Sequence, residues 1–299
     1  MCCPVSHSPL HFDGKALVTT DGRHRYSIET GIPLFAQSGL PPQSQSQRAH
    51  FERVADAYAA NLGYAHTQEY MAYLDRCFHE AAGGGTLGTV AELCCGYGEA
   101  LILLRTAVKR YVGVDLSERM LRGAIARNAH PSAVFVQADA TRVPLADATV
   151  DTVVMLGGIH HVPARAALFA EVARILKPGG HFLFREPVSD FFLWRALRWL
   201  IYRLSPMLDH TAERPLTYEE TVPALVQAGF RDVQYRQHGL LGFCLFMNSD
   251  VLVVNRLFRF IPGIRGIVRL STALDEALLH IPGLRRAGLQ VIGIARKPG

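Results

Sequence analysis

The sequence predicts an α/β fold with a doubly wound, mainly parallel sheet, and three observations support this prediction. Residues 90–115 form an apolar run, a Gly-x-Gly turn, a helix-like apolar stretch and a second apolar run. Residues 134–140 and 150–158 form two more apolar runs, which end in acidic or glycine residues. Residues 175–184 contain a Leu-Lys-Pro-Gly-Gly turn followed by a fifth apolar run. Strand-like runs that alternate with helix-like segments are typical of parallel sheets with helices on both faces.

The Gly-x-Gly turn between the first two strands predicts a nucleoside-binding half-site. Gly96 and Gly98 flank Tyr97, and glycine permits both a sharp turn and the close approach of a ligand to the backbone. Asp115 ends the next strand, where a carboxylate can accept hydrogen bonds from both hydroxyls of a ribose. A dinucleotide fingerprint would need a third glycine at position 101, and this residue is Leu101. The pattern therefore disfavours a nicotinamide cofactor.

The order and spacing of these elements resemble the class I S-adenosylmethionine-dependent methyltransferases. The resemblance covers about residues 88–240, and it depends on the Glu-x-Cys-Cys-Gly-x-Gly loop at residues 92–98 together with the Leu-Lys-Pro-Gly-Gly turn. It implies a Rossmann-like seven-stranded sheet. It also implies S-adenosyl-L-methionine as the cofactor and S-adenosyl-L-homocysteine as the product.

The same resemblance implies which residues contact the cofactor. Glu92 stands where the family keeps an acidic residue near the methionine amino group, and Asp115 would hold the ribose. The other implied contacts lie in the glycine loop and around the adenine, at Cys94, Gly96, Tyr97, Gly98, Leu116, Met120, Asp139, Ala140 and Leu156. Tyr97 replaces the small residue common at its position, so it either covers the cofactor or reaches toward the substrate. The alternative for Asp139 is a helix or turn cap.

Three residues are candidates for proton transfer. His160 and His161 follow the fourth strand, where a side chain points into the cleft, and histidine titrates near neutral pH. Glu186, at the end of the fifth strand, is the third candidate. Each also has a structural alternative: the histidines pack or form hydrogen bonds, and Glu186 forms a salt bridge to Arg185 or to an arginine of a lid.

Composition indicates a globular protein in a reducing compartment. Hydrophobic residues make up 49% of the chain and charged residues 19%, and the net charge of +5 is spread without a basic run. The six cysteines include two adjacent pairs, which is unlike a disulfide framework. No secretory signal is evident, and the apolar stretch at residues 191–204 contains three arginines. We expect a soluble cytoplasmic protein that at most associates with a membrane surface.

Residues 1–37 resemble a degenerate zinc-ribbon-like module of some bacterial methyltransferases. Cys3 and His24 match two of the four ligand positions, whereas Ser6 and Thr20 occupy the other two and are poor zinc ligands. Substitution by neighbouring residues, Cys2 and His7, is the alternative. We expect a metal-free β-hairpin module and no metal in the protein.

The rest of the chain divides into a connecting region and one large domain. Residues 38–84 are predicted to be a linker and N-terminal helices, on which Tyr58 could face the transferred methyl group. Residues 85–299 form the methyltransferase domain, with apolar insertions at about 188–216 and 239–287. We expect these insertions to form a helical lid in which Trp194 and Phe243 contact the substrate. A homodimer interface is the alternative use of such apolar surface.

The apolar insertions favour a hydrophobic small-molecule acceptor, such as a lipid-like, quinone or natural-product compound of secondary metabolism. The alternative is an rRNA base methyltransferase, which the N-terminal module and the positive charge support. Enzymes that methylate exocyclic amines of bases usually carry an Asn- or Asp-Pro-Pro-aromatic motif after the fourth strand, and residues 156–159 read Leu-Gly-Gly-Ile. This makes nucleic acid an unlikely partner. A third hypothesis is a fold reused for another reaction or for partner binding.

Overall fold

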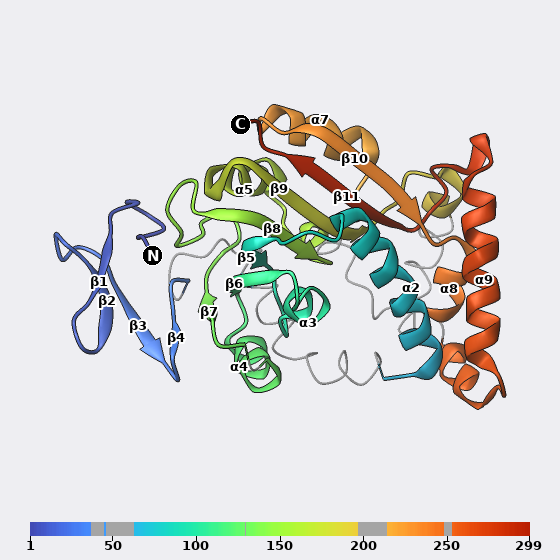
Figure 1. Cartoon of the computed structure of the whole chain (residues 1–299), viewed down its shortest axis with the longest axis horizontal. Coiled ribbons are helices and arrows are strands. Elements are labelled where there is room, and N and C mark those ends of the chain that lie inside the picture. Colours follow the sequence, from blue (N-terminus) through green and yellow to red (C-terminus); the bar gives the residue numbers. More distant parts are fainter. Residues whose placement is uncertain (37–44, 46–62, 129, 197–213, 248–252) are drawn as a thin grey trace.

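Seven strands form the main sheet, in the order β10-β11-β9-β8-β5-β6-β7. The computed structural model describes residues 1–36, 45, 63–128, 130–196, 214–247 and 253–299 (Figure 1). The strands are β5 (Gly88–Leu93), β6 (Val108–Asp115), β7 (Ala133–Gln137), β8 (Val150–Leu156), β9 (Leu176–Pro187), β10 (Arg231–His238) and β11 (Gln290–Arg296). Strand β11 runs antiparallel to both of its neighbours, β9 and β10, and the other pairings in this sheet are parallel. The predicted seven-stranded, doubly wound fold is confirmed.

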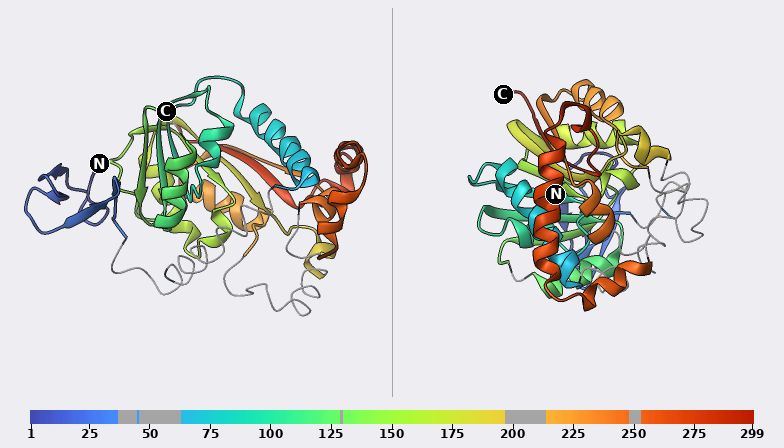
Figure 2. Two further views of the ribbon diagram at one scale, coloured as in Figure 1. Left: turned by 90° about the horizontal axis from the view of Figure 1, so that it is seen from below. Right: turned by 90° about the vertical axis from the view of Figure 1, so that its right-hand side faces the viewer.

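Helices cover both faces of the sheet (Figures 1 and 2). Val153 and Met155 of β8 pack in a core beneath α5 (Arg165–Ile175) and α7 (Tyr218–Gln227), whereas Val154 packs in a second core on the opposite face. The helices over that second core are α2 (Ala65–Ala82), α3 (Glu99–Leu103) and α4 (Glu118–Arg127). Burial on both faces explains why the strands read as unbroken apolar runs.

The fifth strand is longer than the sequence indicates. Strand β9 begins at Leu176, directly after α5, and includes the Pro-Gly-Gly segment that was expected to be a separate turn. Gly179 has φ 77°, and the pairing of β9 with β8 shifts register between Leu176 and His181. The glycines therefore make an irregularity inside the strand and not a turn before it.

The N-terminal residues form a four-stranded antiparallel sheet, which agrees with the predicted β-hairpin module. Its strands are β1 (Leu10–Phe12), β2 (Ala16–Thr19), β3 (Arg25–Glu29) and β4 (Ile32–Pro33). Residues 34–36 then run beside β7 and join the small sheet to the edge of the large one. Phe35 donates to the carbonyl of Gln137 at 2.7 Å, and the buried Gln137 amide bonds the N–H and carbonyl of Ala36 at 3.0 and 3.3 Å.

The C-terminal insertion leaves and rejoins the sheet at the same edge. His238, which ends β10, pairs with Gln290, and Gln290 pairs with Pro187 at the end of β9. Between these points lie α8 (Leu241–Phe246), the 3-10 helix η2 (Val253–Phe260), α9 (Ile264–Leu279) and the 3-10 helix η3 (Pro282–Leu284). Helix α2 packs against α8 and α9 through Tyr70, Leu74, Phe246 and Val268. In the described residues, no helix combines the length and apolarity that a bilayer span requires.

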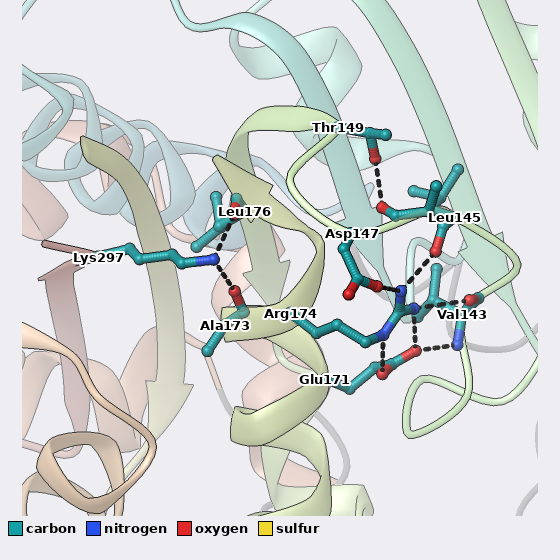
Figure 3. A network of polar contacts seen from close by, with 10 residues as sticks. Val143, Leu145, Asp147, Thr149, Glu171, Ala173, Arg174, Leu176 and Lys297 are labelled. Carbon is teal, nitrogen blue, oxygen red and sulfur yellow. Dashed lines mark hydrogen bonds and ion pairs between the residues drawn. The ribbon is translucent and has the colours of Figure 1, made fainter. Parts of the chain in front are cut away.

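Arg174 of α5 clamps the loop between β7 and β8 (Figure 3). Its guanidinium donates to the carbonyls of Val143 and Leu145, at 3.1 and 2.8 Å, and to Asp147 at 2.6 Å. It also bonds both carboxylate oxygens of the buried Glu171 at 2.8 Å, and Glu171 accepts the N–H of Val143 at 2.6 Å. One ion pair thus fixes most of a loop that has no regular structure of its own.

We predict that Arg174→Gln lowers the free energy of unfolding by about 3 kcal/mol, because it leaves Glu171 buried without its cation. Urea denaturation followed by circular dichroism measures the change. The control is Arg122→Gln, which removes an exposed ion pair with Glu118 in α4 and should cost at most about 0.5 kcal/mol. Equal losses in the two variants would show that the clamp has no special role.

Candidate active site

The loop after β5 turns sharply at the carboxyl edge of the sheet. Cys94, Gly96 and Gly98 have φ of 53°, 49° and 76°, all in the left-handed region that favours glycine. Cys94 is the one residue of these three that is not glycine. It packs closely on Gly158, and a Cβ added to Gly158 would lie 2.6 Å from the Cβ of Cys94. The loops after β5 and β8 are therefore in direct contact, and Gly158 is required for that contact.

Asp115 ties the ends of β5 and β6 together. One carboxylate oxygen accepts the N–H of Gly96 and the other accepts the N–H of Ser117, both at 2.8 Å. Burial raises the pKa of Asp115, and these two hydrogen bonds oppose the rise. Ser117 also caps α4 by accepting the N–H of Met120 at 3.3 Å. The sulfur of Met120 would lie 3.8 Å from a Cβ on Gly96, so the structure brings Gly96, Asp115 and Met120 together.

Glu92 lies beneath the glycine loop. Its side chain is buried, one oxygen accepts the N–H of Ala100 at 3.0 Å, and the hydroxyl of Tyr111 donates to the other. Burial raises the pKa of Glu92 to about 8. Both oxygens are thus engaged within the protein, and the observed geometry makes Glu92 a support for the start of α3.

Tyr97 turns onto α4. A Cβ at Gly123 would lie 2.5 Å from the tyrosine ring, and the guanidinium of Arg127 lies 3.8 Å from the ring centroid. The carbonyl of Tyr97 accepts a hydrogen bond from the Asn128 side chain at 2.8 Å. The Tyr97 ring thus packs on α4. This packing explains the large side chain at position 97 without a contact to the cofactor or to the substrate.

The residues expected around the adenine lie at the ends of β6 and β7. The N–H of Ala138 donates to the carbonyl of Asp115 at 3.0 Å, and the Gln137 side chain donates to the carbonyl of Leu116 at 3.2 Å. Asp139 accepts the N–H and the hydroxyl of Thr141 at 2.8 and 2.7 Å, so it caps a turn. Leu116, Asp139 and the buried Ala140 therefore belong to adjacent strand ends.

The buried Glu186, near the end of β9, pairs with the partly buried His160, which follows β8. One oxygen of Glu186 accepts the N–H groups of Gly158 and Ile159 at 2.7 and 2.8 Å, and the other lies 2.8 Å from Nδ1 of His160. The ring of His161 lies 3.8 Å from that of His160, centroid to centroid. Leu156 is the last residue of β8 and lies at the same edge of the sheet.

The salt bridge suggested between Glu186 and Arg185 is wrong. Adjacent residues in a strand point to opposite faces of the sheet, and Arg185 bonds Asp75 of α2 at 2.6 Å. The Glu186 side chain instead forms hydrogen bonds with backbone N–H groups and with His160. Both oxygens of Glu186 are therefore engaged within the protein.

The expected substrate contacts are only partly described. Tyr58 lies outside the described residues. Trp194 is 9% exposed, donates to the carbonyl of Ala287 at 2.6 Å, and packs in a cluster with Leu240, Leu279 and Leu289. Phe243 packs against the same cluster and makes an edge contact with Tyr70, at 6.0 Å between centroids. The structure thus joins the two insertions through Trp194.

Asp275 is a buried residue that sequence reasoning missed. It accepts the N–H groups of Leu240, Leu241 and Gly242, at 2.9, 3.1 and 2.9 Å, and so holds the start of α8. The sequence signal for it was a carboxylate within the apolar stripe of α9.

One group of possible metal ligands occurs in the described part of the chain. Atoms of Cys77, His238 and Glu276 lie within 4.8 Å of one another. Nδ1 of His238 is 2.9 Å from Glu276, Arg236 is 3.3 Å from the other Glu276 oxygen, and burial raises the pKa of Cys77 to about 11. Hydrogen bonds and a protonated thiol account for this group. Cys3, in the N-terminal module, lies 3.0 Å from the hydroxyl of Tyr26.

Comparisons with known proteins identify relatives of the chain. Residues 91–184 match a family model described as a methyltransferase domain. The chain is 32% identical over 168 residues to the ubiquinone/menaquinone biosynthesis C-methyltransferase of Syntrophotalea carbinolica, over 50% of this chain and 71% of that protein. It is 32% identical over 236 residues to the probable phthiotriol/phenolphthiotriol dimycocerosates methyltransferase 2 of Mycobacterium ulcerans, over 75% of this chain and 73% of that protein.

Solved structures show the same fold. The phosphoethanolamine N-methyltransferase 2 of Haemonchus contortus, in complex with S-adenosyl-L-methionine, aligns with a TM-score of 0.57 at 17% sequence identity. The alignment covers 87% of this chain and 61% of that one. At this identity the likeness concerns the fold alone.

We predict that the free energy of unfolding of the ligand-free protein falls as the pH rises from about 5 to 8. With the pKa of Glu92 at about 8, the native state holds a proton that the unfolded state has released, so stability decreases by up to about 1.4 kcal/mol per pH unit. Urea unfolding across this range measures the slope. Glu92→Gln should flatten it, whereas Glu29→Gln, on the exposed strand β3, should leave it unchanged. Parallel slopes for all three proteins would contradict the assignment.

Proposed function

The chain belongs to the class I S-adenosylmethionine-dependent methyltransferases, and we propose that its methyl acceptor is a hydrophobic small molecule of the lipid-like, quinone or natural-product kind. The observation that carries this proposal is the apolar cluster that α2, α8 and α9 build beside the carboxyl edge of the sheet. Its members include Tyr70, Tyr73, Leu74, Phe246 and Val268. The relatives reported above support the same class, because their names refer to quinones and to phthiotriol lipids.

The residues at the carboxyl edge fit S-adenosyl-L-methionine. Gly96 and Gly98 present backbone without side chains, and Asp115 has acceptor capacity beyond its two hydrogen bonds to Gly96 and Ser117. We assign the ribose to Asp115 and the adenine surroundings to Leu116, Met120, Asp139 and Ala140. Glu92 supports the loop from below.

When bound, the cofactor supplies a methyl group already activated on a sulfonium, so the chain's main task is to position the acceptor. Its second task is to take a proton from an acceptor that must lose one. Glu186 lies 2.8 Å from Nδ1 of His160, which favours the tautomer with its hydrogen on Nδ1. Nε2 of His160 is then the unprotonated nitrogen. We therefore propose His160 as the proton acceptor and Glu186 as the residue that orients it.

The acceptor class can be tested with cofactor that carries a labelled methyl group. We expect label from an incubation of the enzyme with a cell lysate to enter the organic extract. Asp115→Ala should abolish both the transfer and the binding of S-adenosyl-L-homocysteine in calorimetry, and Glu29→Ala is the matched carboxylate control. Label found only in RNA would overturn the proposed acceptor and leave the family assignment intact.

We predict that His160→Gln lowers kcat by about 10²- to 10⁴-fold for an acceptor that must be deprotonated. Affinity for S-adenosyl-L-homocysteine should stay within about twofold, because the proton acceptor does not hold the nucleoside. The fall in kcat should be large in His160→Gln and small in His161→Gln. The opposite pattern would transfer the role to His161.

A further inference from the structure

The outward side of α9 carries no polar side chain along most of its length. Its inward stripe consists of Ile264, Val268, Thr272, Asp275 and Leu279, which are buried against α2 and α8. The exposed residues of α9 are mostly apolar or glycine, namely Gly266, Ile267, Leu270, Ala273, Leu274 and Ala277, and the two exceptions are Arg265 and Arg269. A helix on the surface of a soluble protein normally turns charged and polar residues to this side.

The apolar surface continues beyond both ends of α9. Leu257 and Phe260 of η2 are 59% and 67% exposed, and Leu270 in the middle of α9 is 73% exposed. We call this surface the α9 face, and it comprises Leu257, Phe260, Ile261, Ile267, Leu270, Leu274 and Ile281. In the right-hand view of Figure 2, α9 lies in front and runs along the side of the molecule that faces the viewer. Exposed large apolar residues on one helix and on the segments that flank it mark a site of interaction.

The exposed charged residues within the segment that carries the α9 face are all positive. Between residues 257 and 286 the exposed charged side chains are arginines, at positions 259, 265, 269, 285 and 286. The two carboxylates of this segment turn inward: Asp275 caps α8, and Glu276 bonds His238 at 2.9 Å. Arg269 and Arg286 pair with Glu69 and Glu219. Arg265 lies near enough to Glu69 for its charge to lower the pKa of that carboxyl, after the larger effect of Arg269. Arg285 forms no ion pair among the described residues.

We propose that the α9 face binds the surface of an anionic lipid bilayer, with α9 lying in the plane of the interface. An apolar face bordered by arginines is the pattern of a helix that inserts among head groups while its cations meet lipid phosphates. The helix has 16 residues, so it lies on a bilayer and does not cross it. A second copy of the chain is a poorer occupant, because a twofold contact would bring two arginine-bordered surfaces together.

This placement explains how a hydrophobic acceptor would reach the site, a consequence that rests on the proposed function. The inner side of α9 holds α8, which begins three residues after β10 ends at the carboxyl edge. When the α9 face binds a bilayer, the carboxyl edge of the sheet therefore lies close to the lipid. The binding of the face to lipid follows from the surface alone and does not depend on the acceptor.

Sedimentation with vesicles tests the proposal on the full chain. We expect binding to vesicles of phosphatidylcholine and phosphatidylglycerol, weaker binding to phosphatidylcholine alone, and a loss of binding as salt is raised. Leu270→Glu and Phe260→Glu should weaken binding by about tenfold or more, since each places a charge in the apolar face. The matched control is Phe12→Glu, because Phe12 is 59% exposed on the N-terminal sheet and lies outside the α9 face.

Two further measurements keep the outcomes separate. Circular dichroism and S-adenosyl-L-homocysteine binding should be unchanged in the variants, and the double variant Arg265→Gln, Arg285→Gln should lose the preference for anionic vesicles. Equal binding by wild type and both glutamate variants, or a wild-type dimer in sedimentation velocity that Leu270→Glu dissociates without any vesicle binding, would overturn the proposal. Vesicle binding without labelled organic product would leave the face in place and defeat the proposed acceptor. Labelled organic product without vesicle binding would support the proposed acceptor and defeat the binding of the α9 face to lipid.

Discussion

The carboxyl edge of the sheet depends on buried carboxylates that accept hydrogen bonds from backbone N–H groups of the adjoining loops. Asp115 at the end of β6 holds Gly96 in the loop after β5, and Glu186 at the end of β9 holds Gly158 and Ile159 after β8. Parallel strands end together, so each loop starts beside the strand end that supplies its acceptor. A buried N–H without an acceptor costs about 1–3 kcal/mol, and these carboxylates remove that cost where the loops must be shaped to receive a ligand.

The side chain of Gln137 is one of the contacts that connect the same edge to the N-terminal residues. The amide of Gln137 bonds the backbone of Ala36 on one side and the carbonyl of Leu116 on the other. Because this buried amide forms hydrogen bonds with Ala36 and with Leu116, it links the N-terminal residues to the loop expected beside the adenine. The small sheet is therefore part of the surroundings of the site, even though its own residues, such as Cys3 and Tyr26, bond each other.

The sequence predicted the strands and their ends because both signals are local. Continuous apolar runs reflect burial on two faces, and the residues that stop them, such as Asp115 and Gly157, mark where the chain leaves the sheet. Side-chain partners were not predictable in this way. Arg185 bonds Asp75, which is 110 residues away along the chain. The position of the Tyr97 ring requires a glycine at position 123 in α4. The extra length of β9 likewise depends on pairing with β8 and not on its own composition.

Helix α9 presents a problem of specificity that hydrophobicity alone does not solve. Apolar residues lie both on its inward stripe and on its outward side, so burial of apolar area would permit more than one rotation of the helix on α2. Two adjacent carboxylates distinguish the rotations. Asp275 finds three backbone N–H groups at the start of α8, and Glu276 finds His238 at the end of β10. Any other rotation would leave these acceptors and donors unpaired, so the polar contacts decide which apolar side packs inward and which side, led by Leu270, stays exposed.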